Sequence, residues 1–237
     1  MIILLISLAL SLCTGIGTYF IFGFIASVFP FLAILALSYF FLSKMLSKRL
    51  EKSMIEVQKE LQRQRMDRAI AILIHIKKNF SKWQFFTKSS IDGQIGSIFY
   101  MKHDYLHAKP YLEKSFSRHW VAKAMLGILY YRKKKYNKMD ETFELAVKYS
   151  AKQGLLWSVW AYCLSRAGKN DQAISILLRG KNKLGNSDLR INQNLSNLQN
   201  SKKIKMRSYG EQWYQFHLEL SPQLRQVKGG AVKFARR

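Results

Sequence analysis

Residues 155–180 read LLWSVWAYCLSRAGKNDQAISILLRG, and their pattern decides the fold class. Apolar residues dominate the first half, a polar turn follows at residues 168–171, and apolar residues return at helical spacing in the second half. Ala161 and Ala173 are small residues that let two helices cross closely, while large residues such as Trp157 fill the space beside them. The stretch therefore predicts two helices joined by a short turn.

The same arrangement occurs twice earlier in the chain. When the sequence is aligned on Gly96, Gly127 and Ala161, three units appear at offsets of 31 and 34 residues. In each unit the small residue is preceded by a large one and followed three positions later by an aromatic residue or Leu, and a second helix carries small and large residues in alternation. The shared positions are Ile95-Gly96, Phe99, Ala108, Leu112 and Ser115; Leu126-Gly127, Tyr130, Met139, Phe143 and Ala146; and Trp157, Trp160-Ala161, Leu164, Ala173, Leu177 and Gly180. This pattern resembles the tetratricopeptide repeat (TPR), whose helix pairs stack into an α-solenoid.

The resemblance covers residues 67–186. Asp67-Arg68-Ala69, with Leu73 and Ile76, looks like the second helix of an earlier, incomplete unit. The sequence departs from the family because Met139 replaces a small residue, the first offset is 31 residues rather than 34, and the closing Pro of each repeat is missing. An irregular helical bundle is the alternative architecture.

The residues after the repeats are expected to cover the last hydrophobic face, as a terminal element of a repeat array must do. Residues 187–220 predict C-terminal capping helices. The last of these helices spans about residues 209–220, with Trp213, Phe216 and Leu220 on its apolar side. Residues 221–237 contain Gly229-Gly230 and five basic residues without an acidic one, which predicts a basic, flexible tail.

The N-terminal region differs from the rest of the chain because residues 1–43 contain no Asp, Glu, Lys, Arg or His. One bilayer crossing takes roughly 20 apolar residues, so the region predicts a transmembrane helical hairpin with helices at about residues 2–22 and 29–43. Gly23 closes the first helix, and Pro30 suits the first turn of the second. A cleaved signal peptide is the competing interpretation, but the region lacks a basic start and is far too long. Residues 44–66 predict a basic stalk helix that continues the second crossing.

The charge distribution predicts the orientation in the membrane. The chain carries 39 Lys and Arg against 14 Asp and Glu, a formal net charge of +25, and all of these residues follow residue 43. Lys44, Lys48, Arg49 and Lys52 come directly after the second apolar segment, and positive flanks stay on the cytoplasmic side. We therefore expect an integral protein of the bacterial inner membrane with its repeats in the cytoplasm, where these four residues meet anionic lipid headgroups.

The sequence contains no motif of catalysis, such as a phosphate-binding loop or a nucleophile elbow. The two cysteines, Cys13 and Cys163, form no CxxC pair, which excludes a disulfide framework and a cysteine zinc site. His103 and His107 have the spacing of metal ligands, but a predicted turn separates them and only Asp104 lies nearby as a third ligand. Neither an enzyme activity nor a cofactor or metal site is expected.

The resemblance to the tetratricopeptide repeat implies a groove lined by the first helix of each pair. The residues in groove-facing register are Ser97, Tyr100, Ile128, Tyr131, Arg132, Tyr162 and Arg166. Tyr and Arg are enriched at binding hot spots, so this set predicts a site for a protein partner. The alternative is that part of the set packs between units. Gly93 and Ser97 stand where the family's clamp for chaperone C-termini would be, which disfavours chaperone tails as ligands.

Basic residues also gather away from the membrane flank. The predicted basic patches are Lys44, Lys48, Arg49, Lys52, Lys133, Lys134, Lys135, Lys202, Lys203, Lys205 and Arg207. Their charge suits an acidic protein partner, a component of a membrane complex or anionic lipid; nucleic acid ranks lower because no RNA-binding motif accompanies it. The sequence thus predicts a membrane-anchored scaffold or adaptor that mediates protein–protein interaction or the assembly of a membrane-associated complex. A membrane tether for nucleic acid or ribosomes is the alternative function.

Overall fold

A computed structural model describes residues 2–80, 87–185 and 187–220 of the chain. These residues form eleven α-helices and one 3-10 helix, and no β-strand occurs among them, so the expected all-α class is confirmed. The chain divides into two compact units, Met1–Ile91 and Asp92–Arg237. The boundary falls within helix α4 (Thr87–Met101).

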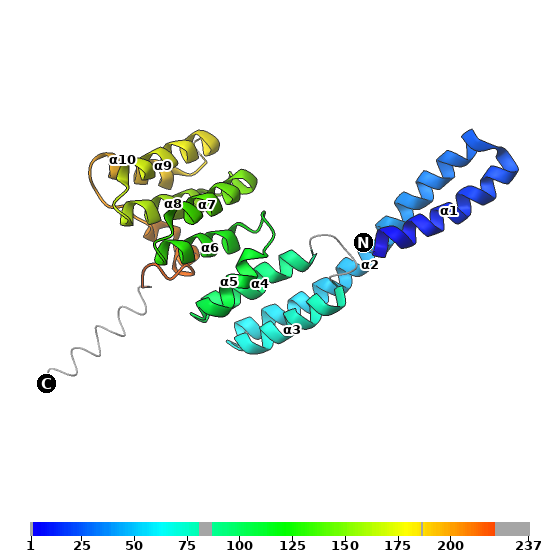
Figure 1. The fold of residues 1–237 in the computed structure, drawn as a ribbon, viewed down its shortest axis with the longest axis horizontal. Helices are drawn as coiled ribbons and strands as arrows, with labels where there is room; N and C mark the ends of the chain where they lie inside the picture. The colour runs from blue at the N-terminus through cyan, green and yellow to red at the C-terminus, as the bar shows by residue number, and fades with distance from the viewer. Residues whose placement is uncertain (1, 81–86, 186, 221–237) are drawn as a thin grey trace. The chain divides into compact units, whose positions relative to one another are not determined.

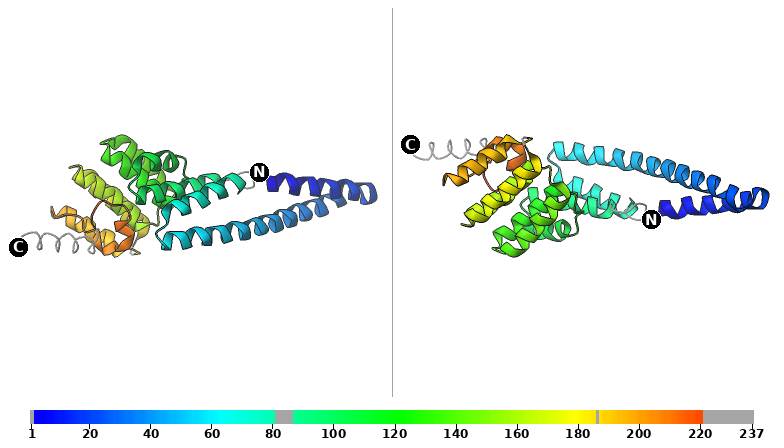
Figure 2. Two further views of the ribbon diagram at one scale, coloured as in Figure 1. Left: turned by 90° about the horizontal axis from the view of Figure 1, so that it is seen from below. Right: turned by 90° about the horizontal axis from the view of Figure 1, so that it is seen from above.

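The first unit begins with two long helices, α1 (Ile2–Phe22) and α2 (Phe24–Gln62), which lie side by side along the N-terminal part of α2 (Figures 1 and 2). Gly23 alone joins them, with a φ of 78°, a left-handed conformation that glycine adopts without steric cost. Within the part of the chain that the structure describes, one helical segment, Ser27–Gln62, is long and apolar enough to cross a membrane. The apolar segment Ile2–Thr18 of α1 is shorter.

The second helix begins at Phe24, not at the expected residue 29. Because Gly23 makes the turn by itself, no further linker residues are needed, and Pro30 lies inside α2 instead of in its first turn. Its missing N–H therefore removes one backbone hydrogen bond from the helix. The helix also continues past residue 43 to Gln62, since Leu50, Val57 and Leu61 keep helical spacing through the charged stretch.

Helix α3 (Met66–Phe80) packs against α2 within the first unit (Figure 1). Its apolar face buries Ala69, Ile70, Leu73 and Ile76. The half-unit that the sequence placed at Asp67 is thus a complete helix whose neighbour is α2.

The second unit contains most of α4 and then six further helices: α5 (Tyr105–Glu113), α6 (Trp120–Arg132), α7 (Tyr136–Ser150), α8 (Gly154–Arg166), α9 (Asn170–Leu184) and α10 (Leu189–Gln199). Helix α6 packs on α7 and α8 packs on α9, while α5 contacts α6 and α7 contacts α8, so that each pair lies against the next (Figure 1). One hydrophobic core runs through the unit from Tyr100 to Phe216.

The same turn ends five helices. In each case a residue with positive φ donates its N–H to the carbonyl three residues earlier, and the next N–H reaches the carbonyl five residues earlier, a helix-terminating arrangement that satisfies the last carbonyls. The residues with positive φ are Gln64 after α2, His103 after α4, Lys134 after α6, Gly168 after α8 and Ser201 after α10. Helix α10 therefore ends as the first helix of another pair would end, although no long second helix follows it up to residue 220.

The small residues at the aligned positions lie where helices cross. A Cβ atom added to Gly127 would lie 2.6 Å from the ring of Phe143, and one added to Gly96 would lie 2.8 Å from the side chain of Leu112. Both pairs, α6 with α7 and α4 with α5, thus cross more closely than any side chain permits at these positions. Met139, which replaces a small residue of the repeat pattern, is fully buried in the core.

Candidate peptide-binding groove

The residues predicted to line a groove lie on α4, α6 and α8, the first helices of their pairs. Three of them are buried, Ser97 and Tyr131 are half-buried, and the two arginines, Arg132 and Arg166, are exposed. The buried three are Tyr100, Ile128 and Tyr162.

Residues 204–220, which we call the C-terminal strap, cover this face. The strap contains the 3-10 helix η1 (Arg207–Tyr209) and the single-turn helix α11 (Glu211–Tyr214), and it returns from α10 to α6 and α8 (Figure 1). The helix expected over residues 209–220 is therefore wrong. Gly210 has a φ of 60° and His217 a φ of 50°, and both values interrupt a right-handed helix.

Residues of α4, α6 and α10 bind the main chain of the strap through three hydrogen bonds. The hydroxyl of Tyr100 donates to the carbonyl of Phe216 at 2.7 Å. The guanidinium of Arg132 donates to the carbonyl of His217 at 2.8 Å. On α10, the side-chain oxygen of Asn194 accepts the N–H of Lys205 at 2.9 Å. These contacts hold an irregular backbone and do not depend on the identity of the strap's side chains.

Two aromatic side chains of the strap, Trp213 and Phe216, are fully buried. Trp213 meets Tyr162 edge-on, with 4.8 Å between ring centroids. Phe216 lies 6.5 Å from the ring of Trp120 on α6 and the same distance from Trp213. Aromatic pairs in such tilted arrangements add stability beyond the area that they bury.

The start of the strap is anchored by Tyr209, whose hydroxyl lies 2.8 Å from the hydroxyl of Ser158 in the core. Arg190 of α10 stacks over the Tyr209 ring at 4.3 Å and donates to Asp188 at 2.7 Å. At the other end, the hydroxyl of Tyr162 donates to the carboxylate of Glu219 at 3.3 Å. The strap is thus held along its length by residues of α4, α6, α8 and α10.

Burial under the strap shifts the pKa of several groups. It raises the pKa of Tyr100 above its ordinary range and that of Tyr162 to about 12, so both hydroxyls keep their protons for donation. The pKa of His217 falls to about 4 because the ring is desolvated and faces His103 and Arg132. The two imidazoles stack with 4.1 Å between their centroids. The folded strap therefore holds His217 in its neutral form.

No known protein family, curated protein or solved structure matches this chain.

The sequence predicted these residues as the lining of a groove for a protein partner, with the alternative that part of the set packs between units. Tyr100, Arg132 and Tyr162 instead contact the chain's own strap. The physical reason is that this face is apolar and aromatic, so that residues 204–220 bury Trp213 and Phe216 on it. Sequence reasoning missed Trp120, Ser158 and Asn194 as groove residues, since their contacts are with a segment distant in the chain and no local pattern marks them.

The other predicted groove residues lie outside these contacts. The hydroxyl of Ser97 donates to the carbonyl of Gly93 in its own helix at 2.8 Å. Burial raises the pKa of Tyr131, and the nearby Arg166 opposes that rise. Arg166 lines a shallow pocket with Lys202 and Lys203, so that it joins one of the predicted basic patches.

All residues of the predicted basic patches are exposed. They fall into three places: residues 44–52 on α2, the turn at residues 133–135 between α6 and α7, and residues 202–207 at the start of the strap. Each unit therefore presents cations to solvent, and one group of them borders the groove.

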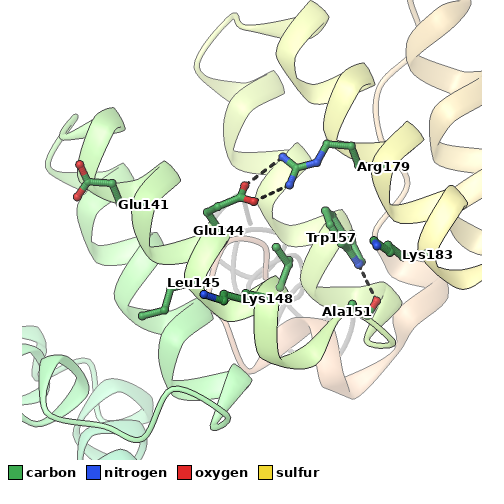
Figure 3. A pocket seen from close by; sticks show the side chains of 9 residues that line it. Glu141, Glu144, Leu145, Lys148, Ala151, Trp157, Arg179 and Lys183 are labelled. Carbon is green, nitrogen blue, oxygen red and sulfur yellow. Dashed lines mark hydrogen bonds and ion pairs between the residues drawn. The ribbon is translucent and has the colours of Figure 1, made fainter.

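A further pocket lies between α7, α8 and α9, away from the strap contacts (Figure 3). Arg179 donates to both carboxylate oxygens of Glu144, at 2.6 and 3.0 Å, and stacks over Trp157 at 5.6 Å. The indole N–H of Trp157 donates to the carbonyl of Ala151 at 2.8 Å. Arg179 and Trp157 thus have their hydrogen-bond partners within the protein. We interpret the pocket as the junction of two helix pairs.

The two histidines considered as metal ligands, His103 and His107, make local contacts at the turn before α5 and in its first turn. Asp104 caps this helix by accepting the N–H of His107 at 3.2 Å, and its carboxylate lies 2.8 Å from the His107 ring. His103 instead lies beside Tyr105, 2.9 Å from its hydroxyl. Among the residues that the structure describes, no group of three or more His, Cys, Asp or Glu side chains could hold a metal ion.

Proposed function

We propose that this protein is a membrane-anchored scaffold whose helical repeats bind a segment of a protein partner. The observation that carries the proposal is the strap: the groove holds an irregular peptide by its main-chain carbonyls and by two buried aromatic residues. A surface that can do this for the chain's own residues has the chemistry to do it for a segment of another protein.

We propose that the helix pairs belong to a TPR-like α-solenoid. Three features support this assignment: the recurring turn after α2, α4, α6, α8 and α10, the close crossings at Gly96 and Gly127, and the location of the predicted groove residues on first helices. In repeat arrays of this kind each pair contacts only its neighbours, and the terminal element differs from the others. The strap would be that terminal element.

We propose that α1 and the N-terminal part of α2 cross the bacterial inner membrane as a hairpin. The apolar character of both helices and the single-residue turn at Gly23 support this. Lys44, Lys48, Arg49 and Lys52 would then lie at the cytoplasmic headgroups and place the repeats in the cytoplasm.

The excess positive charge favours an acidic partner or a component of a membrane complex. Arg132, Arg166, Lys202 and Lys203 border the groove or lie close to it, so an acidic segment would gain from them on association. The same charge supports the second candidate function, a tether for nucleic acid or ribosomes. The two functions differ in what holds the complex together.

The test is crosslinking in intact membranes of the source cell. A photoreactive residue replaces Arg166 at the groove edge, and a control replaces the exposed Lys138 on α7. After irradiation, neighbours are identified by mass spectrometry with and without nuclease treatment. We expect the groove position to capture a protein that the control position does not capture, and we expect this capture to survive nuclease.

Two outcomes contradict the scaffold. If capture at residue 166 disappears after nuclease, the tether for nucleic acid or ribosomes is the better function. If both positions capture the same set of abundant proteins, the groove has no specific partner.

A further inference from the structure

We propose that the groove recognises a partner segment with the order aromatic residue, two intervening residues, phenylalanine, acidic residue, and that the C-terminal strap occupies the same site in the absence of the partner. The inference rests on the proposed function and names the chemistry of its partner.

The spacing comes from the two buried anchors of the strap. Trp213 and Phe216 are three residues apart, and the single helical turn of α11 begins just before the first of them. Residues at this spacing project from one side of a turn. The ring at position 213 needs no hydrogen-bonding group, because the indole N–H of Trp213 is buried and has no hydrogen-bond partner among the described residues. The first position therefore requires an aromatic ring but no hydrogen bond from it.

The second anchor is more restricted. Phe216 is fully buried beside Trp120, and its carbonyl accepts the hydroxyl of Tyr100. A partner must present an apolar ring here and, at the same residue, a free carbonyl. The Tyr100 hydroxyl and the Arg132 guanidinium donate hydrogen bonds to the carbonyls of two consecutive residues, Phe216 and His217. Together these bonds fix the register of the bound segment.

The acidic position comes from the poor fit of His217. This residue stacks on His103 at 4.1 Å and faces the Arg132 guanidinium, and its ring nitrogen Nδ1 is buried without a partner within the described part of the chain. A neutral ring with an unsatisfied nitrogen next to a cation is a weak contact, whereas a carboxylate at this position would accept hydrogen bonds from the cation. A partner that carries Asp or Glu here would therefore bind better than the strap.

Exchange of the strap for a partner requires none of the helices α4 to α10 to unfold. The strap follows the turn at Asn200, Ser201 and Lys202, where the last carbonyls of α10 are already satisfied within the turn. The segment can leave the groove by rotation at residues 200–203 while α10 remains packed on α8 and α9.

The experiment uses the full chain in detergent with a protease site placed in the exposed turn at residues 200–203. After cleavage, the strap is held only by its contacts, and fluorescent synthetic peptides of residues 204–220 compete for the groove. Four peptides are compared: the natural sequence, His217→Glu, Phe216→Ala, and Gln212→Ala as the matched control, since Gln212 is exposed.

We expect the natural peptide to enter the cut chain, and the His217→Glu peptide to bind about tenfold more tightly. The Phe216→Ala peptide should not bind measurably, and the Gln212→Ala peptide should equal the natural one. The uncut chain should take up each peptide far more weakly, because its tethered strap competes at an effective concentration of the order of millimolar.

Three results overturn the inference: the cut chain excludes every peptide, the His217→Glu peptide binds no better than the natural one, or the uncut chain forms a dimer that requires residues 204–220. The last result would assign the groove to a second copy of the chain. If a specific protein is captured at residue 166 and any of these results is also found, only the proposed ligand motif is rejected and the scaffold function is retained. If peptides exchange but no specific protein is captured, the scaffold function is rejected and the proposed chemistry of peptide binding is retained.

A second measurement does not depend on cleavage. In the uncut chain, His217→Glu should raise the thermal midpoint by about 2–4 °C, and His217→Gln, which adds no charge, should raise it less. A lower midpoint for His217→Glu than for His217→Gln would show that the position does not favour an acid.

Discussion

Tyr100 illustrates how one buried group fixes the position of the strap. Its side chain is fully buried, and its hydroxyl makes a 2.7 Å hydrogen bond to the carbonyl of Phe216, 116 residues away in the chain. Tyr130, by comparison, donates to Glu113 at 2.8 Å from a partly exposed position. The same substitution at the two tyrosines therefore separates a buried hydrogen bond from an exposed one.

We expect Tyr100→Phe to lower the free energy of unfolding by about 1–2 kcal/mol, because it leaves a buried carbonyl without a donor. Tyr130→Phe should cost less than about 0.5 kcal/mol, since water can replace its partner. Urea unfolding followed by circular dichroism measures both values. Equal costs at the two positions would show that the Phe216 carbonyl is accessible to water, and that the strap does not seal the groove.

His217 makes the strap sensitive to acid. Its pKa falls from an ordinary value of 6.5 to about 4 in the folded chain. Between these two pH values His217 is therefore protonated in the unfolded chain and neutral in the folded chain. The free energy of unfolding should therefore decrease as the pH is lowered from about 6.5 to about 4, and this contribution should level off below that. Protonation would place a cation beside the Arg132 guanidinium.

The measurement compares thermal unfolding of the natural chain and of His217→Gln across that pH range. Burial also lowers the pKa of His119, so the variant should keep part of the slope. The difference between the two curves isolates His217, and parallel curves would mean that its imidazole has the same pKa in the folded and the unfolded chain.

At the scale of helices, the close crossing of two helices at Gly127 affects stability more than the helix propensity of this residue does. Alanine is a better helix former than glycine by about 1 kcal/mol, so Gly127→Ala would stabilise an isolated helix. In α6, however, the added Cβ would lie 2.6 Å from the Phe143 ring of α7. We expect Gly127→Ala to destabilise the chain by about 1–3 kcal/mol, measured by urea unfolding.

The control for this prediction relieves the contact from the other side. In a Phe143→Leu background the smaller side chain leaves room for the Cβ, so the added cost of Gly127→Ala should largely disappear. If Gly127→Ala is equally costly in both backgrounds, the crossing of α6 and α7 is not what requires glycine.

The helices were predictable from local patterns, whereas the strap was not. Small residues such as Gly127 and the turn at residues 168–171 are local signals, and both predict a crossing or a helix end from neighbouring residues alone. Trp213, Phe216 and Leu220 have the spacing of an amphipathic helix, yet they belong to an irregular segment that is held by residues far away in sequence. Periodicity indicates which side chains need burial but not which surface buries them.

The same distinction explains the outcome for the groove. The repeat register placed Tyr100, Arg132 and Tyr162 on a common face, and the structure shows all three in contact with one segment. This segment belongs to the chain itself because burying Trp213 and Phe216 in the groove has a lower free energy than leaving them in water. The alignment of three units carries no information about this comparison.

At the scale of the whole molecule, charge and hydropathy divide the chain into an uncharged apolar part and a strongly basic part. Residues 1–43 carry no charged side chain, while the remainder carries a net charge of +25. A soluble chain would have to bury the apolar faces of α1 and α2, yet Phe20, Phe40 and Phe41 are more than half exposed within the described residues. A lipid environment would make this exposure favourable, as the proposed membrane anchor requires.

We therefore expect the full chain to remain in the membrane fraction after extraction with alkaline carbonate or high salt, whereas a variant that lacks residues 1–43 is released. The side of the membrane follows from trypsin treatment, since the turn at residues 133–135 consists of three exposed lysines. Inside-out vesicles should be cut there and sealed right-side-out vesicles should be cut only after detergent is added, because positive flanks stay in the cytoplasm. Cleavage in the opposite orientation would reverse the topology, and release by carbonate would mean that cations along α2, rather than apolar helices, hold the protein to the bilayer.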